Sequence, residues 1–270
     1  MVKWYRLDKV FATNTQYTAE EDRFYVVKAI GTDVSDNVTV KVRGVPAGTI
    51  NSYVAPLAKT SSNEFGPLNL KDKFIVIPPD SKFEFESTGS GNVRLIGLIG
   101  VLGPGESLPG EHQARYAAQG SRYVTVLSDS YSVGTDTAWP NGVEFEVYSL
   151  TPATIETYVL NDRIGVKIDN LSSSLTAGQV GIKFYLDSVA LDVLGSTMGP
   201  HGLDAYFMQI PPTDSVNEEG YTLADNPITV EGDHNLIVKA KNISGGALSP
   251  ATDTSITITL YAVAEYIRRT

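Results

Sequence analysis

The pattern of apolar and polar positions predicts β-strands along nearly the whole chain. In residues 74–102, the apolar run Ile75–Ile77 precedes a Pro-Pro-Asp-Ser turn, an alternating segment with Phe83 and Phe85 on one face, and a long apolar run from Val93. Alternation with period two is typical of a half-buried strand, and proline, aspartate and serine favour turns. The segment therefore predicts a β-meander.

The same pattern returns near the C-terminus, which indicates an internal repeat. Five residues stand 153 positions after Ile75, Ile77, Asp80, Phe83 and Phe85, namely Ile228, Val230, Asp233, Leu236 and Val238. The alternating segment Val38–Val42 is matched by residues 180–184 at a spacing of 142, and the dipeptide Asp22-Arg23 resembles Asp162-Arg163. Ordered matches separated by loop-sized insertions are expected of duplicated domains.

These patterns predict an all-β protein of two tandem antiparallel β-sandwich or jelly-roll domains. We place the first domain at residues 1–105 and the second, with longer loop insertions, at 106–270, because the stretch 103–110 is rich in Gly and Pro. Residues 3–11 are the first predicted strand, and residues 56–72, 128–141 and 186–220 are predicted to be long exposed loops. Strand number and long loops favour the jelly roll over an immunoglobulin-like sandwich. Gly97 and Gly100 inside an apolar strand indicate close packing or a bulge.

The amino-acid composition excludes several classes of function but adds little to the predicted fold. The chain has 270 residues, 42% of them hydrophobic and 19% charged, as in folded globular proteins. A net charge of −10 argues against direct nucleic-acid binding, which depends on clustered Lys and Arg. The absence of cysteine excludes disulfides and thiolate metal sites. We expect no membrane-spanning helix and no signal peptide, since the chain has no apolar run of suitable length and its first residues alternate.

Candidate chemistry is sparse. The three histidines are scattered, and no nucleotide-binding, metalloprotease or hydrolase motif occurs, so no catalytic residue, cofactor or metal is assigned. Glu84 with Glu86, and Glu144 with Glu146, are two apart on predicted strands, a spacing typical of a solvated strand face. Acidic loops, at Asp33 and Asp36, at Asp129 and Asp136, and at Asp214 with Glu218 and Glu219, lack a known calcium-ligand spacing.

One segment stands out as a possible ligand or interface loop. Tyr131, Asp136 and Trp139 fall together in the predicted loop 128–141. Exposed aromatic side chains there would offer a stacking platform for a sugar, whereas the alternative is that the same rings pack in a core or an interface.

The meander also carries a resemblance to a protein family. With the segments IVIPP at 75–79 and RLIGLI at 94–99, and with Asp80 and Asp233 in equivalent turns, the chain resembles major capsid proteins of tailless, internal-membrane-containing icosahedral viruses. These viruses infect bacteria and archaea and belong to the single-jelly-roll lineage, which has two major capsid proteins. The resemblance implies a non-enzymatic virion protein, made in the host cytoplasm. Its partners would be further copies of itself or a second capsid protein, and contact with a viral membrane is allowed.

Two other functions stay open. The first is a carbohydrate- or receptor-binding β-sandwich module, such as a spike, a fibre head or an adhesin, with Trp139 at the binding rim. The second is a glycoside hydrolase that uses Glu144 or Glu146, which would require two carboxyl groups roughly 5 Å apart in a cleft.

Overall fold

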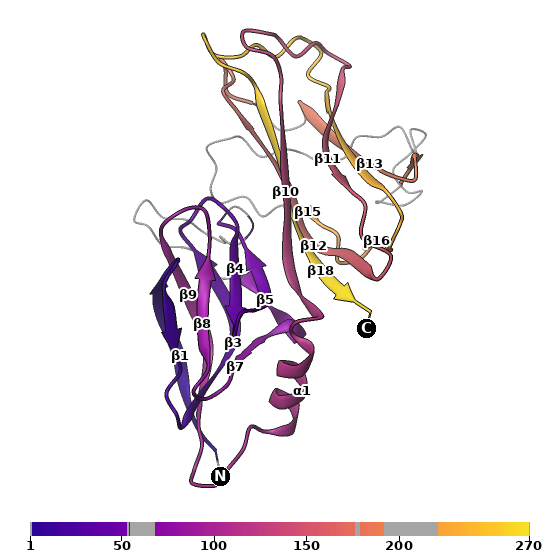
Figure 1. Cartoon of the computed structure of the whole chain (residues 1–270). Coiled ribbons are helices and arrows are strands. Elements are labelled where there is room, and N and C mark those ends of the chain that lie inside the picture. The colour runs from indigo at the N-terminus through magenta and orange to yellow at the C-terminus, as the bar shows by residue number, and fades with distance from the viewer. Residues whose placement is uncertain (1, 53, 55–67, 176–178, 192–220, 270) are drawn as a thin grey trace. The chain divides into compact units, whose positions relative to one another are not determined.

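The computed structural model describes residues 2–52, 54, 68–175, 179–191 and 221–269, and these are mostly β-strand (Figure 1). The chain divides into two compact units. The first comprises Met1–Val126 together with Glu265–Thr270, and the second comprises Leu127–Ala264. The strands of both units pair in antiparallel fashion, so the predicted all-β class is confirmed.

The first unit contains two sheets. Its strands are β1 (Lys3–Ala12), β2 (Gln16–Thr18), β3 (Arg23–Thr32), β4 (Val38–Val42), β5 (Val45–Ile50), β6 (Leu68–Asn69), β7 (Ile75–Ile77), β8 (Lys82–Glu86) and β9 (Asn92–Val101), with the short 3₁₀ helix η1 (Lys71–Lys73) before β7. One sheet has the order β1-β9-β3-β6, with β7 also on β3, and the other β2-β8-β4-β5. When β6 and β7 are taken as one interrupted strand, this is the eight-stranded, two-sheet arrangement of a jelly roll.

The second unit repeats this order. Its strands are β10 (Arg122–Ser132), β11 (Glu144–Leu150), β12 (Glu156–Asp169), β13 (Val180–Leu186), β14 (Val189–Ala190), β15 (Tyr221–Thr222), β16 (Ile228–Val230), β17 (Leu236–Asn242) and β18 (Thr257–Arg268). The sheets are β10-β18-β12-β15, with β16 on β12, and β11-β17-β13-β14. Each strand thus takes the place of the strand nine numbers before it, which confirms the duplication.

The repeat holds at the level of single residues in the meander. Strand β7 sets Ile77 opposite Tyr25 of β3, and β16 sets Val230 opposite Tyr158 of β12. In the turns that follow, Asp80 and Asp233 both adopt a positive φ, 51° and 69°. Aspartate tolerates this left-handed conformation better than most residues do.

One predicted match is wrong. Because Tyr25 and Tyr158 occupy equivalent places, Arg23 corresponds to Glu156, whereas Arg163 lies in the middle of the fourteen-residue strand β12. The dipeptide Asp162-Arg163 therefore resembles Asp22-Arg23 only in sequence.

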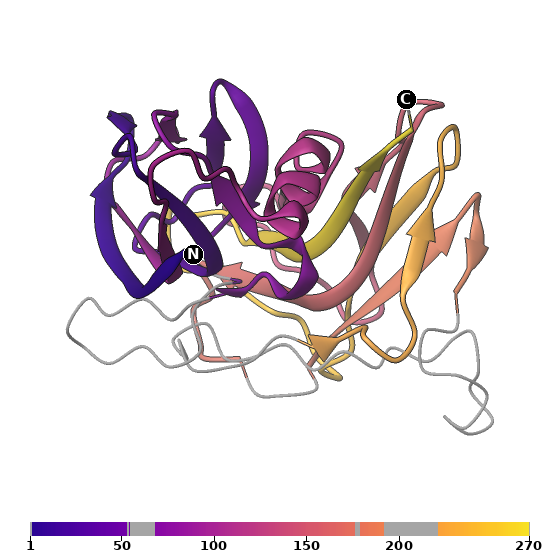
Figure 2. The ribbon, with the colours of Figure 1, turned by 90° about the horizontal axis from the view of Figure 1, so that it is seen from below.

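The division between the units differs from the predicted boundary at 105. The chain after the Gly- and Pro-rich stretch forms helix α1 (Gly110–Ala118), which packs against the first unit (Figure 1 and Figure 2). Just after the helix, the Gln119 side chain bonds both the N–H and the C=O of Val76 on β7, each at 3.1 Å. The stretch is therefore a connection inside the first unit, and the division comes at 126/127, within β10.

The three predicted loops compare differently with the structure. Residues 56–67 of the first loop and 192–220 of the third lie outside the described residues. The rest of the first loop contains β6 and η1, and the third begins at the end of β13 and includes β14. In the second loop, strand β10 continues to Ser132, so the loop is shorter than predicted.

Each unit encloses a core between its two sheets. In the first unit, Phe11 of β1 packs edge-on against Phe83 of β8 with ring centroids 5.4 Å apart, and Tyr25 of β3 contacts the same ring at 6.1 Å. In the second unit, one cluster of buried residues draws Ile164 from one sheet and Phe184 from the other. In the described part of the chain, no helix is long and apolar enough to cross a membrane.

Two glycines in β9 show why this strand needs residues without a side chain. Gly97 faces Val27 where β3 has an irregular register, and a Cβ added there would lie 2.0 Å from the Val26 carbonyl oxygen. A Cβ on Gly100 would lie 2.2 Å from the Phe24 ring. The prediction that these glycines mark close packing or a bulge is confirmed, because both lie close to β3 and Gly97 faces its irregular register.

We predict that Gly97→Ala lowers the free energy of unfolding by about 1–3 kcal/mol, because the added methyl group overlaps backbone atoms of β3. Gly110→Ala is the matched control, since a Cβ on this first residue of α1 meets no atom within 4 Å, and its effect should stay within about 0.5 kcal/mol. Denaturant unfolding followed by circular dichroism measures both, and equal stabilities would contradict the packing argument.

Candidate functional site

The aromatic residues of the predicted ligand loop lie in the second unit. Tyr131, near the end of β10, stacks on Phe145 of β11 with centroids 4.6 Å apart, and Trp139 contacts the same ring at 5.6 Å. The Trp139 side chain is fully buried, and its Nε1 donates a hydrogen bond to the Val143 carbonyl at 2.9 Å. Its backbone forms an isolated β-bridge with Leu248. Of the two alternatives for Trp139, the structure therefore shows core packing and no exposed sugar platform, since the indole fills the core.

Asp136 plays a local structural role. It has a positive φ of 51°, and its N–H donates to the Thr254 carbonyl at 2.9 Å. Its Oδ1 accepts a hydrogen bond from the Asp253 N–H at 2.8 Å. The exposed Asp136 thus ties two loops together, whereas Tyr131 and Trp139 meet through Phe145.

The paired carboxylates lie opposite lysines. In the register between β11 and β17, Glu144 faces Lys241 and Glu146 faces Lys239, and the Lys241 Nζ is 3.6 Å from Glu144 Oε1. In the first unit, Glu84 faces Lys41, whose Nζ is 2.6 Å from Glu86 Oε2. Cross-strand pairs of opposite charge are a common way to stabilise a polar sheet face.

The described acidic residues engage in loop contacts. Asp33 Oδ1 accepts from the Asn92 N–H at 2.6 Å, and Asp36 Oδ2 accepts from the Thr88 hydroxyl at 3.1 Å. Over the described residues, no group of three or more His, Asp or Glu side chains is placed to hold a metal ion. Asp214, Glu218, Glu219 and His201 lie outside the described residues.

The other two histidines have opposite environments. His112 of α1 is buried, and its ring contacts those of Trp4, Phe24 and Phe74 at 5.5, 5.6 and 5.8 Å. Loss of hydration there lowers the pKa of His112. His234 is exposed, and its Nδ1 lies 2.6 Å from Asp187 Oδ2, a contact that raises the pKa of His234.

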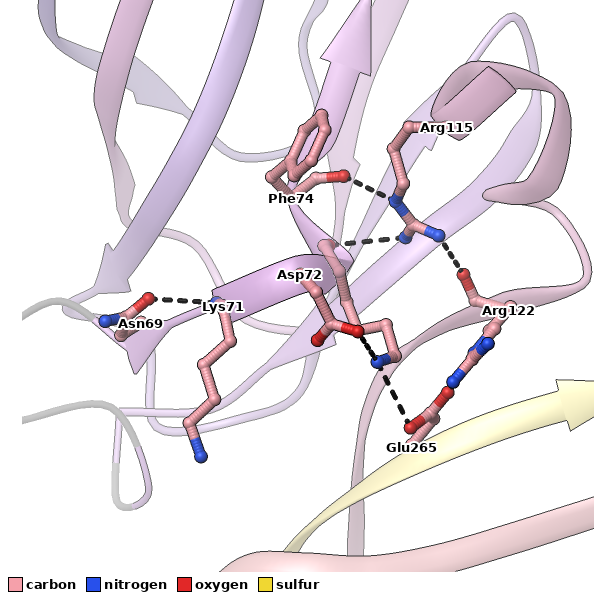
Figure 3. Close-up of polar contacts among 8 residues, drawn as sticks. Asn69, Lys71, Asp72, Phe74, Arg115, Arg122 and Glu265 are labelled. Carbon is pink, nitrogen blue, oxygen red and sulfur yellow. Dashed lines mark hydrogen bonds and ion pairs between the residues drawn. The ribbon is translucent and has the colours of Figure 1, made fainter. Parts of the chain in front are cut away.

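A group of charged residues lies within the first unit, which includes the last residues of β18 (Figure 3). Glu265 of β18 pairs with Lys73 at 3.3 Å and also with Arg122, and Lys73 in turn contacts Asp72. Only 11% of the Lys73 side chain and 9% of the Glu265 side chain are exposed. Charges buried this deeply need partners of opposite charge, and Lys73 and Glu265 each have one.

Arg115 is the central donor beside this group. Its guanidinium donates to the carbonyls of Phe74 and Arg122 at 2.7 Å each and to that of Lys73 at 3.2 Å (Figure 3). It thereby connects α1 to η1, to Phe74 just before β7, and to the start of β10. The role of Arg115 could not be recognised from the sequence, because a single Arg in a short helix carries no motif that reveals its acceptors.

The free edge of β1 is the most unusual surface of the described chain. This ten-residue strand ends its sheet, and it carries three exposed large hydrophobic side chains: Trp4 (43%), Tyr5 (56%) and Val10 (57%). We call this surface the β1 edge. Long exposed edges that carry apolar side chains are predisposed to pair with other chains.

Comparisons with known proteins assign no family. No model of a protein family matches the chain, and no curated protein matches it. Among solved structures, a quasi-atomic model of the PBCV-1 virus capsid has a TM-score of 0.32 and 9% identity, covering 99% of this chain and 95% of that one.

Two enzymes give lower scores. PNGase F, a glycosylasparaginase from Flavobacterium meningosepticum, has a TM-score of 0.27 and 7% identity, covering 98% of this chain and 90% of that one. A β-porphyranase of glycoside hydrolase family 86 from Bacteroides plebeius has a TM-score of 0.23 and 9% identity, covering 95% of this chain and 35% of that one. Scores this low carry no argument about function.

We predict that Arg115→Lys lowers the free energy of unfolding by about 2 kcal/mol or more, because one ammonium group cannot reach three carbonyls in different directions. Arg6→Lys is the control, since the Arg6 side chain is 78% exposed and should tolerate the change. Both are measured by denaturant unfolding of dilute protein. A loss no larger than that of the control would show that Arg115 does not anchor α1.

A second prediction concerns pH. In an NMR titration, His112 should titrate below the ordinary value of 6.5 and His234 above it. Since the pKa of His112 is lower in the folded chain, its contribution to stability is lost as pH falls below 6.5. The contribution of His234 has the opposite sign and is lost as pH rises through its folded pKa. The reverse order of the two pKa values would contradict the two environments described.

Proposed function

We propose that this protein is a structural subunit of a viral capsid, which assembles with copies of itself or with a second capsid protein. The observation that carries the proposal is the β1 edge, a ten-residue sheet edge with exposed Trp4, Tyr5 and Val10 in an otherwise well-packed β protein. Charged residues, prolines or a covering element usually blunt such an edge. Strand β1 carries four charged residues, Lys3, Arg6, Asp8 and Lys9, but it has no proline, and in the described chain no second strand covers it. Its retention favours a role in assembly.

The duplicated architecture supports the same role. Two jelly-roll units with the same strand order make up the described chain, and the jelly roll is an architecture used by viral capsids, although lectins and cupins also use it. The side chains singled out for chemistry take part in local structure: Trp139 fills a core, Asp136 ties loops, and Glu144 lies beside a lysine. A shell subunit needs rigid units and contact surfaces.

The carbohydrate-binding alternative has less support than the sequence indicated. Its rationale was an exposed aromatic rim around Trp139, and that ring lies in the core of the second unit. Tyr131 is half-buried and stacked on Phe145, so no free aromatic platform remains at this loop.

The test is the mass of the purified protein across salt and pH, measured by light scattering after size-exclusion chromatography, with electron microscopy of the same fractions. We expect masses above the 29.1 kDa of one chain and regular oligomers, sheets or shells. Higher salt should favour assembly, because it screens the repulsion between copies that each carry a net charge of −10. A monomer under all conditions, with no partner protein found, would overturn the proposal.

A further inference from the structure

We propose that the β1 edges of two copies of this chain pair with each other, antiparallel and about a two-fold axis at Leu7. The two sheets that contain β1 would then become one continuous sheet. This inference rests on the proposed self-association and names the contact that produces it.

The backbone of β1 has hydrogen-bonding groups available for such a pairing. At the end of the strand, the Thr13 N–H donates to the Gly91 carbonyl at 2.9 Å, whereas the Ala12 N–H turns away from β9 and donates to the Tyr17 hydroxyl at 3.0 Å. Because the direction alternates along a strand, odd-numbered residues of β1 bond to β9 and even-numbered residues face the free edge. In the described chain, β9 is the only strand paired with β1.

The side chains of β1 are complementary to a second copy of themselves. An antiparallel pair centred on Leu7 sets Arg6 opposite Asp8 of the second copy, and by symmetry Asp8 opposite that copy's Arg6. Trp4 then faces Val10, and Tyr5 faces Lys9. Each of the three exposed hydrophobic side chains thereby gains a neighbour.

In this pairing, even-numbered residues lie opposite even-numbered residues, as the direction of the free backbone groups requires. Arg6, Asp8, Trp4 and Val10 are all even-numbered, so their N–H and C=O groups point at the free edge and meet the same groups of the second copy. The Arg6 side chain is 78% exposed and holds Asp8 of its own chain at 3.0 Å. Arg94 bonds the same carboxylate at 2.9 Å, which leaves Arg6 free to turn to the second copy.

Charge also selects against the neighbouring registers. An axis moved by one residue, to Arg6 or to Asp8, would place two arginines or two aspartates directly opposite each other. A parallel pair in register would do both. Like charges directly opposite are destabilising in a sheet, so the axis at Leu7 is the one in which Arg6 and Asp8 are matched with each other.

The first experiment tests the register by disulfide cross-linking. The chain has no cysteine of its own, so every disulfide must come from the introduced residues. Tyr5→Cys and Lys9→Cys chains are mixed and oxidised, and we expect disulfide dimers that contain one chain of each kind, since directly opposite residues lie within disulfide reach. Either variant alone should dimerise poorly, because its own cysteines would be four residues out of register, roughly 14 Å apart. Val45→Cys replaces Tyr5→Cys as the control, since Val45 is 46% exposed on another strand. Mixed dimers no more abundant than in this control would overturn the pairing.

The second experiment tests the charges by sedimentation equilibrium. R6D and D8R should each weaken dimerisation at least about tenfold, because each change puts like charges opposite at two symmetric places. The double variant R6D/D8R should bind more tightly than D8R, since it restores opposite charges across the pair, while the new arginine at position 8 lies near Arg94 in both variants. Thermal unfolding of every variant shows whether the fold is kept. Failure of the double variant to recover, with the fold intact, would count against the register.

The outcomes separate this inference from the proposed function. Self-association that is unchanged by R6D, without mixed disulfides, would overturn the β1 pairing and leave the structural role standing. Dimers that form through β1 but never assemble further, alone or with a second protein, would support the pairing and overturn the capsid role.

Discussion

The first unit depends on how the backbone hydrogen-bonding groups are satisfied at the two edges of the sheet that runs from β1 to β6 and β7. Beside β7, helix α1 and the residue that follows it supply the missing partners: Gln119 bonds both backbone groups of Val76, and Arg115 donates to the carbonyls of Lys73 and Phe74. These two side chains form the hydrogen bonds that a neighbouring strand would otherwise form, so this segment covers the edge of the sheet as well as connecting two strands. On the far side, β1 has no such cover in the described chain.

The sequence allowed the fold to be predicted where local pattern and tertiary role coincide. Period-two alternation marked β4 and β8 and their copies β13 and β17, because burial of one sheet face demands it. Asp80 and Asp233 were found because a left-handed turn restricts the residue type. Gly97 was recognised as a packing site because a glycine inside an apolar strand often marks a bulge or the close approach of another backbone.

What could not be predicted depends on contacts between distant residues. The stretch at 103–110 has the composition of a linker, and tertiary contacts such as the bonds of Arg115 and Gln119 assign the residues after it to the first unit. Trp139 lies among turn residues, yet a carbonyl four positions ahead accepts its N–H and lets the ring be buried. The alternation of residues 3–11 predicted a strand but could not tell that β1 ends its sheet, because sheet order is set by the whole topology.

The duplication has left the two copies of one strand with different surfaces. Strand β10 takes the place of β1 and also ends its sheet, but its exposed residues are all polar: Arg122, Asp129, Ser130 and Ser132. A chain with two equal adhesive edges could add further chains at both and grow into an open filament. A chain with one adhesive edge is saturated by a single neighbour through that contact. Under the β1 pairing proposed above, the divergence of the two copies would let each chain bind one neighbour at this contact, so that growth through it would stop at a dimer.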